Sequence, residues 1–189
     1  MIAVSYTSRN MQNDLQFRFN PRKAIEAILW VATRRPEGVD YYKILKTLLD
    51  ADVYHLNTYG RILTGDQYVA MAHGPVPDYA YQIIKGELLA VHDLGEIPFS
   101  VGDKSMVCPK RPPEMDQLSE SDVEALEHGW MRCKDLSFNE LHALYADHPA
   151  YKKVWEHKST GSDLINIADF LEDKTSLEEL KELAPRLQI

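Results

Sequence analysis

The chain has 189 residues, a formal net charge of −8, 44% hydrophobic residues and 26% charged residues. These values are typical of one ordinary globular domain, and they exclude wholesale disorder and any need for disulfide staples. The acidic charge disfavours general binding to nucleic-acid backbones and favours encounters with a basic partner.

Membrane attachment and export are not expected. No apolar run approaches the roughly 20 residues that cross a bilayer. The first residues lack the basic start and long apolar stretch of a signal peptide. We therefore expect a cytoplasmic protein.

The N-terminal third of the chain predicts an arm followed by two helices. Residues 1–19 are polar and irregular and form the expected arm. A helix is predicted over residues 20–35, because its Asn-Pro start suits a helix cap and first turn. A second helix is predicted over about residues 40–56, and Asp52 lies in the middle of its apolar face. A carboxylate there must find hydrogen-bond partners when it is buried.

The middle of the chain predicts turns and short strands. Residues 57–66 are polar and contain two glycines, which indicates a turn-rich connection. Residues 67–71 predict a short strand, and residues 73–77 predict a sharp break. A short helix is predicted over residues 79–85. Alternating apolar residues within 87–113 predict a small antiparallel element.

The C-terminal part predicts further helices. Ser119 and Ser137 each precede an acid by three residues and are flanked by apolar residues, which is the pattern of a capping box with a hydrophobic staple. Pro149 starts a short helix, and residues 175–183 predict another. The predicted fold class is α+β, a mostly helical single domain with a small antiparallel β element.

Catalytic motifs are absent from the sequence. The nearest approach to a metal set is Asp52, His55 and His73, although a hydrogen-bonded buried Asp52 is the plainer interpretation. Cys108 and Cys133 lie far apart, form no metal-ligand spacing and are expected to be reduced, packed thiols. Nothing in the sequence brings Cys108 to a histidine as a nucleophile pair. We expect no enzyme, no metal and no cofactor.

A DNA-reading helix is an alternative, because four cations flank the first predicted helix: Arg22, Lys23, Arg34 and Arg35. Cations favourably meet a helix C-terminus, which accounts for the last two without DNA. Nucleic-acid binding is therefore not expected.

The segment 54–77 concentrates residues of the kind that anchor protein interfaces. Tyrosine and arginine offer a large contact area with a polar end. The candidate partner-binding residues are Tyr54, Tyr59, Arg61, Asp66 and Tyr68. Packing of these tyrosines in the core is the open alternative.

The same region resembles the signature of the Panacea domain of SocA-like antitoxins. The matching stretches, in order and spacing, are Asp52-Val53-Tyr54-His55-Leu56, Tyr59-Gly60-Arg61, Thr64-Gly65-Asp66-Gln67-Tyr68-Val69-Ala70-Met71 and Gly74-Pro75-Val76-Pro77. The resemblance extends over residues 20–157 and leaves a C-terminal helical tail at 158–189. It departs at Leu49 and Asp50, where the family tends to have aromatic residues.

This resemblance implies an antitoxin of a bacterial or phage toxin–antitoxin system, whose partner is a cognate toxin neutralised by direct binding. The SocA branch implies an alternative, an adaptor that delivers its toxin to a ClpXP-type protease. No catalytic residue is implied. We interpret five motif residues as scaffold: Asp52, Gly60, Gly65, Gly74 and Pro75.

Overall fold

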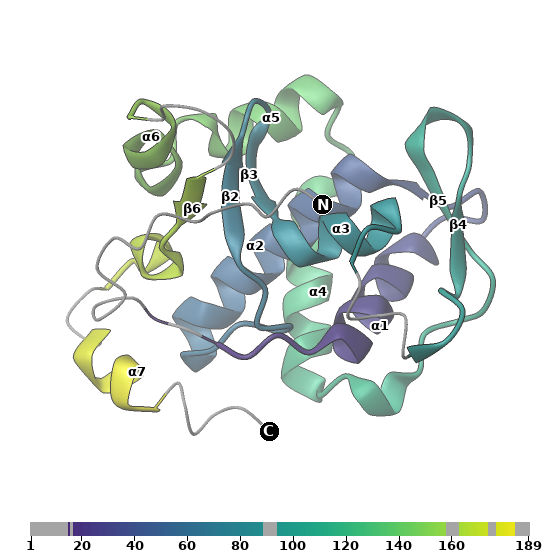
Figure 1. Ribbon diagram of the computed structural model, residues 1–189, viewed down its shortest axis with the longest axis horizontal. Helices are drawn as coiled ribbons and strands as arrows, with labels where there is room; N and C mark the ends of the chain where they lie inside the picture. Colours follow the sequence, from purple (N-terminus) through teal and green to yellow (C-terminus); the bar gives the residue numbers. More distant parts are fainter. Residues whose placement is uncertain (1–14, 16, 89–93, 158–162, 174–176, 184–189) are drawn as a thin grey trace.

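The computed structural model describes residues 15, 17–88, 94–157, 163–173 and 177–183. Its α-helices are α1 (Pro21–Ala32), α2 (Tyr41–Tyr59), α3 (Asp78–Lys85), α4 (Glu120–Cys133), α5 (Phe138–Ala146), α6 (Pro149–Trp155) and α7 (Leu177–Leu183). Helix α2 runs through the middle of the molecule, between α1 and the β2–β3 hairpin and against α4 (Figure 1). No helix within the described ranges combines the length and apolar character needed to cross a bilayer.

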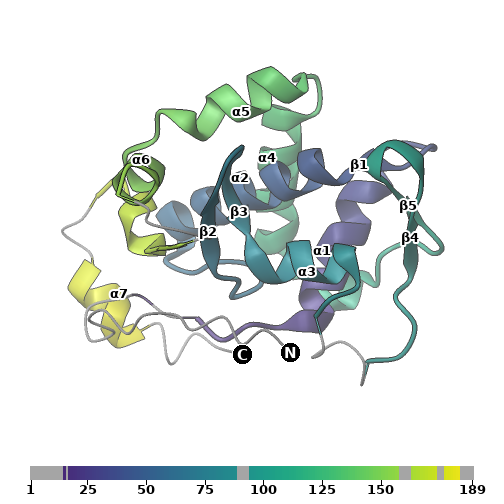
Figure 2. The same cartoon turned by 45° about the horizontal axis from the view of Figure 1, so that its top comes forward.

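Two small antiparallel sheets flank the central helices. One has the strand order β1-β5-β4, built from β1 (Val39–Asp40), β4 (Phe99–Val101) and β5 (Met106–Pro109). The other has the order β3-β2-β6, built from β2 (Tyr68–Met71), β3 (Gly74–Pro77) and β6 (Asp163–Ile165). Figure 2 shows the two sheets on opposite sides of α1 and α3, with α5 above them. The predicted class, a mostly helical α+β domain, is confirmed.

Most predicted elements recur at close to their predicted bounds, but residues 73–77 differ. Residues 73–77 were expected to form a break, but Gly74–Pro77 forms β3, whose Pro75 and Pro77 face Ala70 and Tyr68 of β2. Proline cannot donate to a ladder, but it is tolerated on an edge strand, and β3 lies at the edge of its sheet. Both predicted capping boxes are present.

Parts of the predicted arm and tail, residues 1–14, 16, 158–162, 174–176 and 184–189, lie outside the described residues. Within the described tail, β6 pairs antiparallel with β2, Ile165 facing Tyr68. Strand β6 was not predicted from the sequence, because three residues carry too little alternation to indicate a strand.

The core is built around α1, which is buried on every side from Ala24 to Ala32. The buried surface of this helix is wider than the single apolar stripe of a surface helix. Helices α2, α3 and α4 and strand β5 all pack against α1, so it has no solvent-facing side over these residues. A helix surrounded in this way is apolar over most of its circumference, and the buried acid of α1, Glu26, is paired with Arg111.

Helices α2 and α4 pack unusually closely at Gly129. A Cβ atom at this position would lie 2.4 Å from the backbone oxygen of Thr47 and 3.0 Å from the backbone nitrogen of Ala51. Glycine weakens a helix interior, so its presence here reflects the close approach of the two backbones.

We predict that Gly129→Ala lowers the free energy of unfolding by roughly 1–3 kcal/mol, because overpacking forces the helices apart. Gly102→Ala is the matched control, since the added Cβ would meet only the Met106 backbone oxygen at 3.9 Å. Chemical denaturation of both variants measures the difference. An alanine at 129 that stabilised the protein through helix propensity would contradict the packing described here.

Candidate functional site

Asp52 in α2 is a buried carboxylate with a partner on each oxygen. Its Oδ1 accepts a hydrogen bond from the Leu63 backbone N–H at 2.6 Å, and its Oδ2 accepts one from the Tyr68 hydroxyl. Burial raises the pKa of Asp52 to about 6, although the two donors lower it. The carboxylate therefore fastens the connection after α2, and the start of β2, to the middle of α2.

Asp66 performs a similar task for α3. Its two oxygens accept hydrogen bonds from the backbone N–H groups of Tyr79 and Ala80 at 2.9 and 2.8 Å. Both N–H groups belong to the first turn of α3, where the helix backbone provides no acceptor and Pro77 provides no side-chain cap. Burial raises the pKa of Asp66 to about 8, against the effect of both backbone donors.

The motif glycines sit where a side chain would not fit. Gly65 has φ +71°, and a Cβ there would lie 2.0 Å from the Arg18 backbone oxygen. At Gly74 a Cβ would lie 2.8 Å from Nζ of Lys46, and this Lys46 ammonium is buried and donates to the Pro75 carbonyl at 2.7 Å. Gly60 ends α2 in the left-handed conformation. These contacts support the interpretation of the motif as scaffold.

Lys46 was not predicted from the sequence to be a structural residue. It occupies the apolar side of α2, has no exposed surface, and burial lowers its pKa to about 7. A lysine between Leu45 and Thr47 gives no signal that its ammonium will be buried against a carbonyl.

A second cluster of charges centres on Asp122 near the start of α4. Its carboxylate is fully buried and lies 2.6 Å from Lys23 Nζ, 3.4 Å from Arg61 Nη1 and 3.6 Å from His55 Nε2. Burial would raise the pKa of Asp122, but hydrogen bonds from Lys23 and Ser119 together lower it below its ordinary value. Asp122 thus joins α1, α2 and α4 at one point. Its capping-box position was recognised in the sequence, but its contacts with Lys23, Arg61 and His55 were not.

An exposed feature lies beside this cluster, on the face shared by α2 and α4. The hydroxyls of Tyr54 and Tyr59 each donate to one oxygen of Glu124, both at 2.6 Å. These hydrogen bonds lower the pKa of Glu124, so its carboxylate stays charged. The Tyr54 ring stacks on His128 with ring centroids 4.2 Å apart. One carboxylate therefore fixes two surface tyrosines.

The structure separates the five candidate contact residues into two groups. Tyr54, Tyr59 and Arg61 reach the surface, and Tyr59 is 41% exposed. Asp66 and Tyr68 are 5% and 1% exposed, so a docked partner cannot touch them unless the domain opens. The sequence left core packing and surface contact open for these tyrosines, and the structure places Tyr54 and Tyr59 at the surface and Tyr68 in the core, on β2.

The alternative metal set is not brought together. Asp52 is bonded to Leu63 and Tyr68, while His55 Nδ1 lies 2.8 Å from the Arg61 carbonyl oxygen. His73 lies at the β2–β3 turn and packs against other aromatic rings. Across the described ranges, no three His, Cys, Asp or Glu side chains gather as a metal site.

The two cysteines and three of the four cations that flank α1 have contacts within the fold. Cys108 Sγ lies 3.6 Å from the Glu37 carbonyl oxygen, and burial raises the pKa of Cys133 to about 12, which leaves this thiol unreactive. The Arg34 guanidinium lies 3.4 Å above the Trp30 ring, and Arg35 donates to the Lys134 carbonyl. With Lys23 bonded to Asp122, three of the four cations flanking α1 have intramolecular roles.

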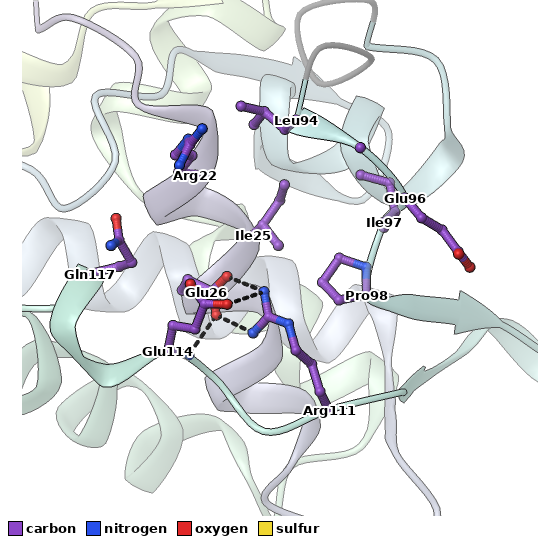
Figure 3. A pocket seen from close by; sticks show the side chains of 11 residues that line it. Arg22, Ile25, Glu26, Leu94, Glu96, Ile97, Pro98, Arg111, Glu114 and Gln117 are labelled. Atoms are coloured by element: carbon purple, nitrogen blue, oxygen red, sulfur yellow. Dashed lines mark hydrogen bonds and ion pairs between the residues drawn. The ribbon is translucent and has the colours of Figure 1, made fainter.

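A cavity of about 180 Å³ lies beside the first turns of α1 (Figure 3). Its buried acid, Glu26, is held by both terminal nitrogens of Arg111 at 2.6 and 2.9 Å and by the Glu114 backbone N–H at 2.7 Å. With both oxygens engaged, Glu26 attaches the segment after β5 to α1. The cavity is small, and its buried acid, Glu26, has a structural role.

We predict that Asp52→Ala lowers the free energy of unfolding by roughly 1–3 kcal/mol, because the Leu63 N–H and the Tyr68 hydroxyl lose their acceptor inside the protein. Asp147→Ala is the control, since the Asp147 side chain is 90% exposed and its ion pair with Lys152 lies on the surface. Equal denaturation midpoints for wild type and Asp52→Ala would contradict the described contacts.

The raised pKa of Asp52 also predicts a pH dependence. Between its ordinary unfolded value near 4 and its folded value of about 6, the folded state keeps a proton that the unfolded state releases. The contribution of Asp52 to stability is therefore fully present below pH 4 and is lost as pH rises through 6. Relative to Asp52→Asn, which does not titrate, wild type should lose on the order of 2–3 kcal/mol across this window. Urea denaturation of both proteins at steps of pH measures this difference, and a gain with rising pH would contradict it.

One known protein family matches the part of the chain that contains these scaffold residues. The family described as Antitoxin SocA-like, Panacea domain matches residues 44–152, which is more than half of the chain. No curated protein and no solved structure matches the chain. The matched range contains Asp52, Asp66, Asp122 and the two tyrosines bonded to Glu124. The chain belongs to the SocA-like antitoxin family that is defined by the Panacea domain.

Proposed function

We propose that this protein is the antitoxin of a bacterial or phage toxin–antitoxin pair and neutralises its cognate toxin by direct contact through Tyr54, Tyr59 and Arg61. The observation that carries the proposal is the attachment of two surface tyrosines to Glu124. Tyrosine is favoured as an interface anchor. A side chain already held in place loses less conformational entropy on binding.

The surroundings of these residues support the same function. Arg61 Nη2 lies 3.0 Å from Ser121 Oγ and 3.3 Å from Ser119 Oγ, so its guanidinium is directed toward the start of α4. Two buried carboxylates join α2 to α4, because Asp122 of α4 lies 3.6 Å from His55 and Asp50 of α2 lies 3.0 Å from Arg132. A surface carried on two locked helices presents the same arrangement to every partner molecule it meets.

The family also suggests an adaptor that delivers the toxin to a ClpXP-type protease. Both mechanisms require contact with the toxin, but they differ in the fate of the bound toxin. Growth rescue in cells that lack the protease separates them: direct neutralisation persists there, whereas an adaptor loses its effect.

A gel shift with the protein's own promoter at physiological salt tests the DNA-binding autoregulator, since binding at low salt alone is non-specific.

We predict that the protein rescues growth from the product of the adjacent gene, and that Tyr59→Ala weakens toxin binding by roughly 10- to 100-fold, as interface anchors do. Phe138→Ala is the matched control, because Phe138 is an exposed aromatic residue, 49% accessible, on α5. Isothermal titration of the purified pair gives both affinities. Absence of rescue together with absence of a complex would exclude the proposed function.

A further inference from the structure

An open groove of about 680 Å³ continues from Tyr54 along α4. We call it the α4 groove, and it is lined by Tyr54, Glu120, Val123, Glu124, Glu127, His128, Met131 and Arg132. Except for Tyr54, every lining residue belongs to α4. At about 1.5 Å per residue, residues 120–131 extend over about 16 Å, or three helical turns.

The floor of the α4 groove is apolar and exposed. Met131 is 54% exposed, Val123 is half-buried, and the Tyr54 ring forms one wall. Methionine is flexible and polarisable, and it adapts its shape to an apolar partner. Exposed apolar side chains bordered by charged residues are typical of a protein-binding surface.

The rim of the groove is acidic. Glu120, Glu124 and Glu127 lie one helical turn apart along the exposed side of α4. Glu124 is kept charged by its tyrosine hydroxyl donors, and Glu127 forms an ion pair with Arg34 at 3.7 Å on the surface. The three carboxylates therefore present a line of negative charge beside the apolar floor.

The two basic residues that line the groove, His128 and Arg132, both contact the buried carboxylate of Asp50. Arg132 Nη1 lies 3.0 Å from Asp50 Oδ1, and His128 Nδ1 lies 3.2 Å from Asp50 Oδ2. Asp50 itself is only 1% exposed and also accepts a hydrogen bond from Tyr145. Asp50 thus offsets the charge of Arg132 and leaves the acidic rim dominant.

We propose, resting on the proposed function, that the α4 groove binds a basic amphipathic helix of the toxin. Apolar side chains of that helix lie on Val123 and Met131, and its lysines or arginines pair with Glu120, Glu124 and Glu127. Positions three and four residues apart on a three-turn helix match the spacing of the three glutamates. Opposite charges on the two surfaces speed the encounter and fix the register.

Other occupants fit the groove less well. A second copy of this chain would bring the same row of carboxylates against the first, and like charges facing each other are repelled. A nucleic-acid strand would meet the same repulsion. All lining residues except Tyr54 are on one helix, so the groove offers no strand edge to an extended peptide.

The first test uses a fluorescent three-turn synthetic helix with leucines on one face and lysines elsewhere, at about 0.15 M salt to screen distant charges. Glu120→Lys/Glu127→Lys leaves the Glu124 contacts intact and should weaken peptide binding by about tenfold or more, as loss of charge complementarity does. Glu87→Lys/Glu156→Lys is the control, because it changes net charge equally at exposed positions outside the groove. Equal weakening by the two double variants would overturn the proposal.

A second variant addresses the apolar floor without altering charge. Met131→Ala removes an exposed side chain and should leave thermal stability unchanged while weakening peptide binding severalfold, since it removes apolar contact area. Unchanged binding by Met131→Ala would contradict the role assigned to the floor.

The same variants, tested for growth rescue from the product of the adjacent gene, separate this proposal from the proposed function. Loss of rescue by Glu120→Lys/Glu127→Lys but not by the control supports both. Full rescue by every variant overturns the α4 groove and leaves the antitoxin function standing. Failure of wild type to rescue or to form a complex with that product, with specific peptide binding retained, overturns the antitoxin function and leaves the α4 groove as a site for a basic helix of another protein.

Discussion

A carboxylate removed from water must keep its oxygens partnered, and this constraint organises the protein. Asp52 holds the connection after α2 and strand β2, Asp66 holds the first turn of α3, and Asp122 holds α1 and α2 against α4. Apolar contacts alone allow helices to slide and repack. Polar groups with fixed partners permit one arrangement, because any other leaves a charge or a donor unpaired.

The same arrangement places the surface residues. Helix α2 carries Asp52 on its inner side and Tyr54 on its outer side, and α4 carries Asp122 inside and Glu124 outside. The close approach of the helices at Gly129 brings the two outer sides together. The tyrosines, the acidic row and the exposed Met131 therefore form one continuous face whose shape is set by buried contacts.

Local signals in the sequence predicted most of the fold. The Asn-Pro start of α1 and the capping boxes at Ser119 and Ser137 fix helix ends through contacts within a few residues, so the chain alone reveals them. Partners far apart in sequence were not predictable. Nothing in the sequence pattern links Asp122 to Lys23 or Glu124 to Tyr54. Strand β3 was not predicted, because its two prolines are typical of a break in the chain. The sequence indicated Tyr54, Tyr59 and Arg61 as candidate contact residues by their residue types. The glutamates of α4 beside them were not predicted, because their position depends on how α4 packs against α2.

The limits of the family match do not coincide with the packed unit. Helix α1, buried on every side, precedes residue 44, and β6, which covers one edge of β2, follows residue 152. A fragment cut at those limits would leave the central space of α1 unfilled and the backbone donors and acceptors of β2 open along one side. Such an unpaired edge recruits strands from other molecules. Expression of the matched range by itself would therefore favour self-association through β2.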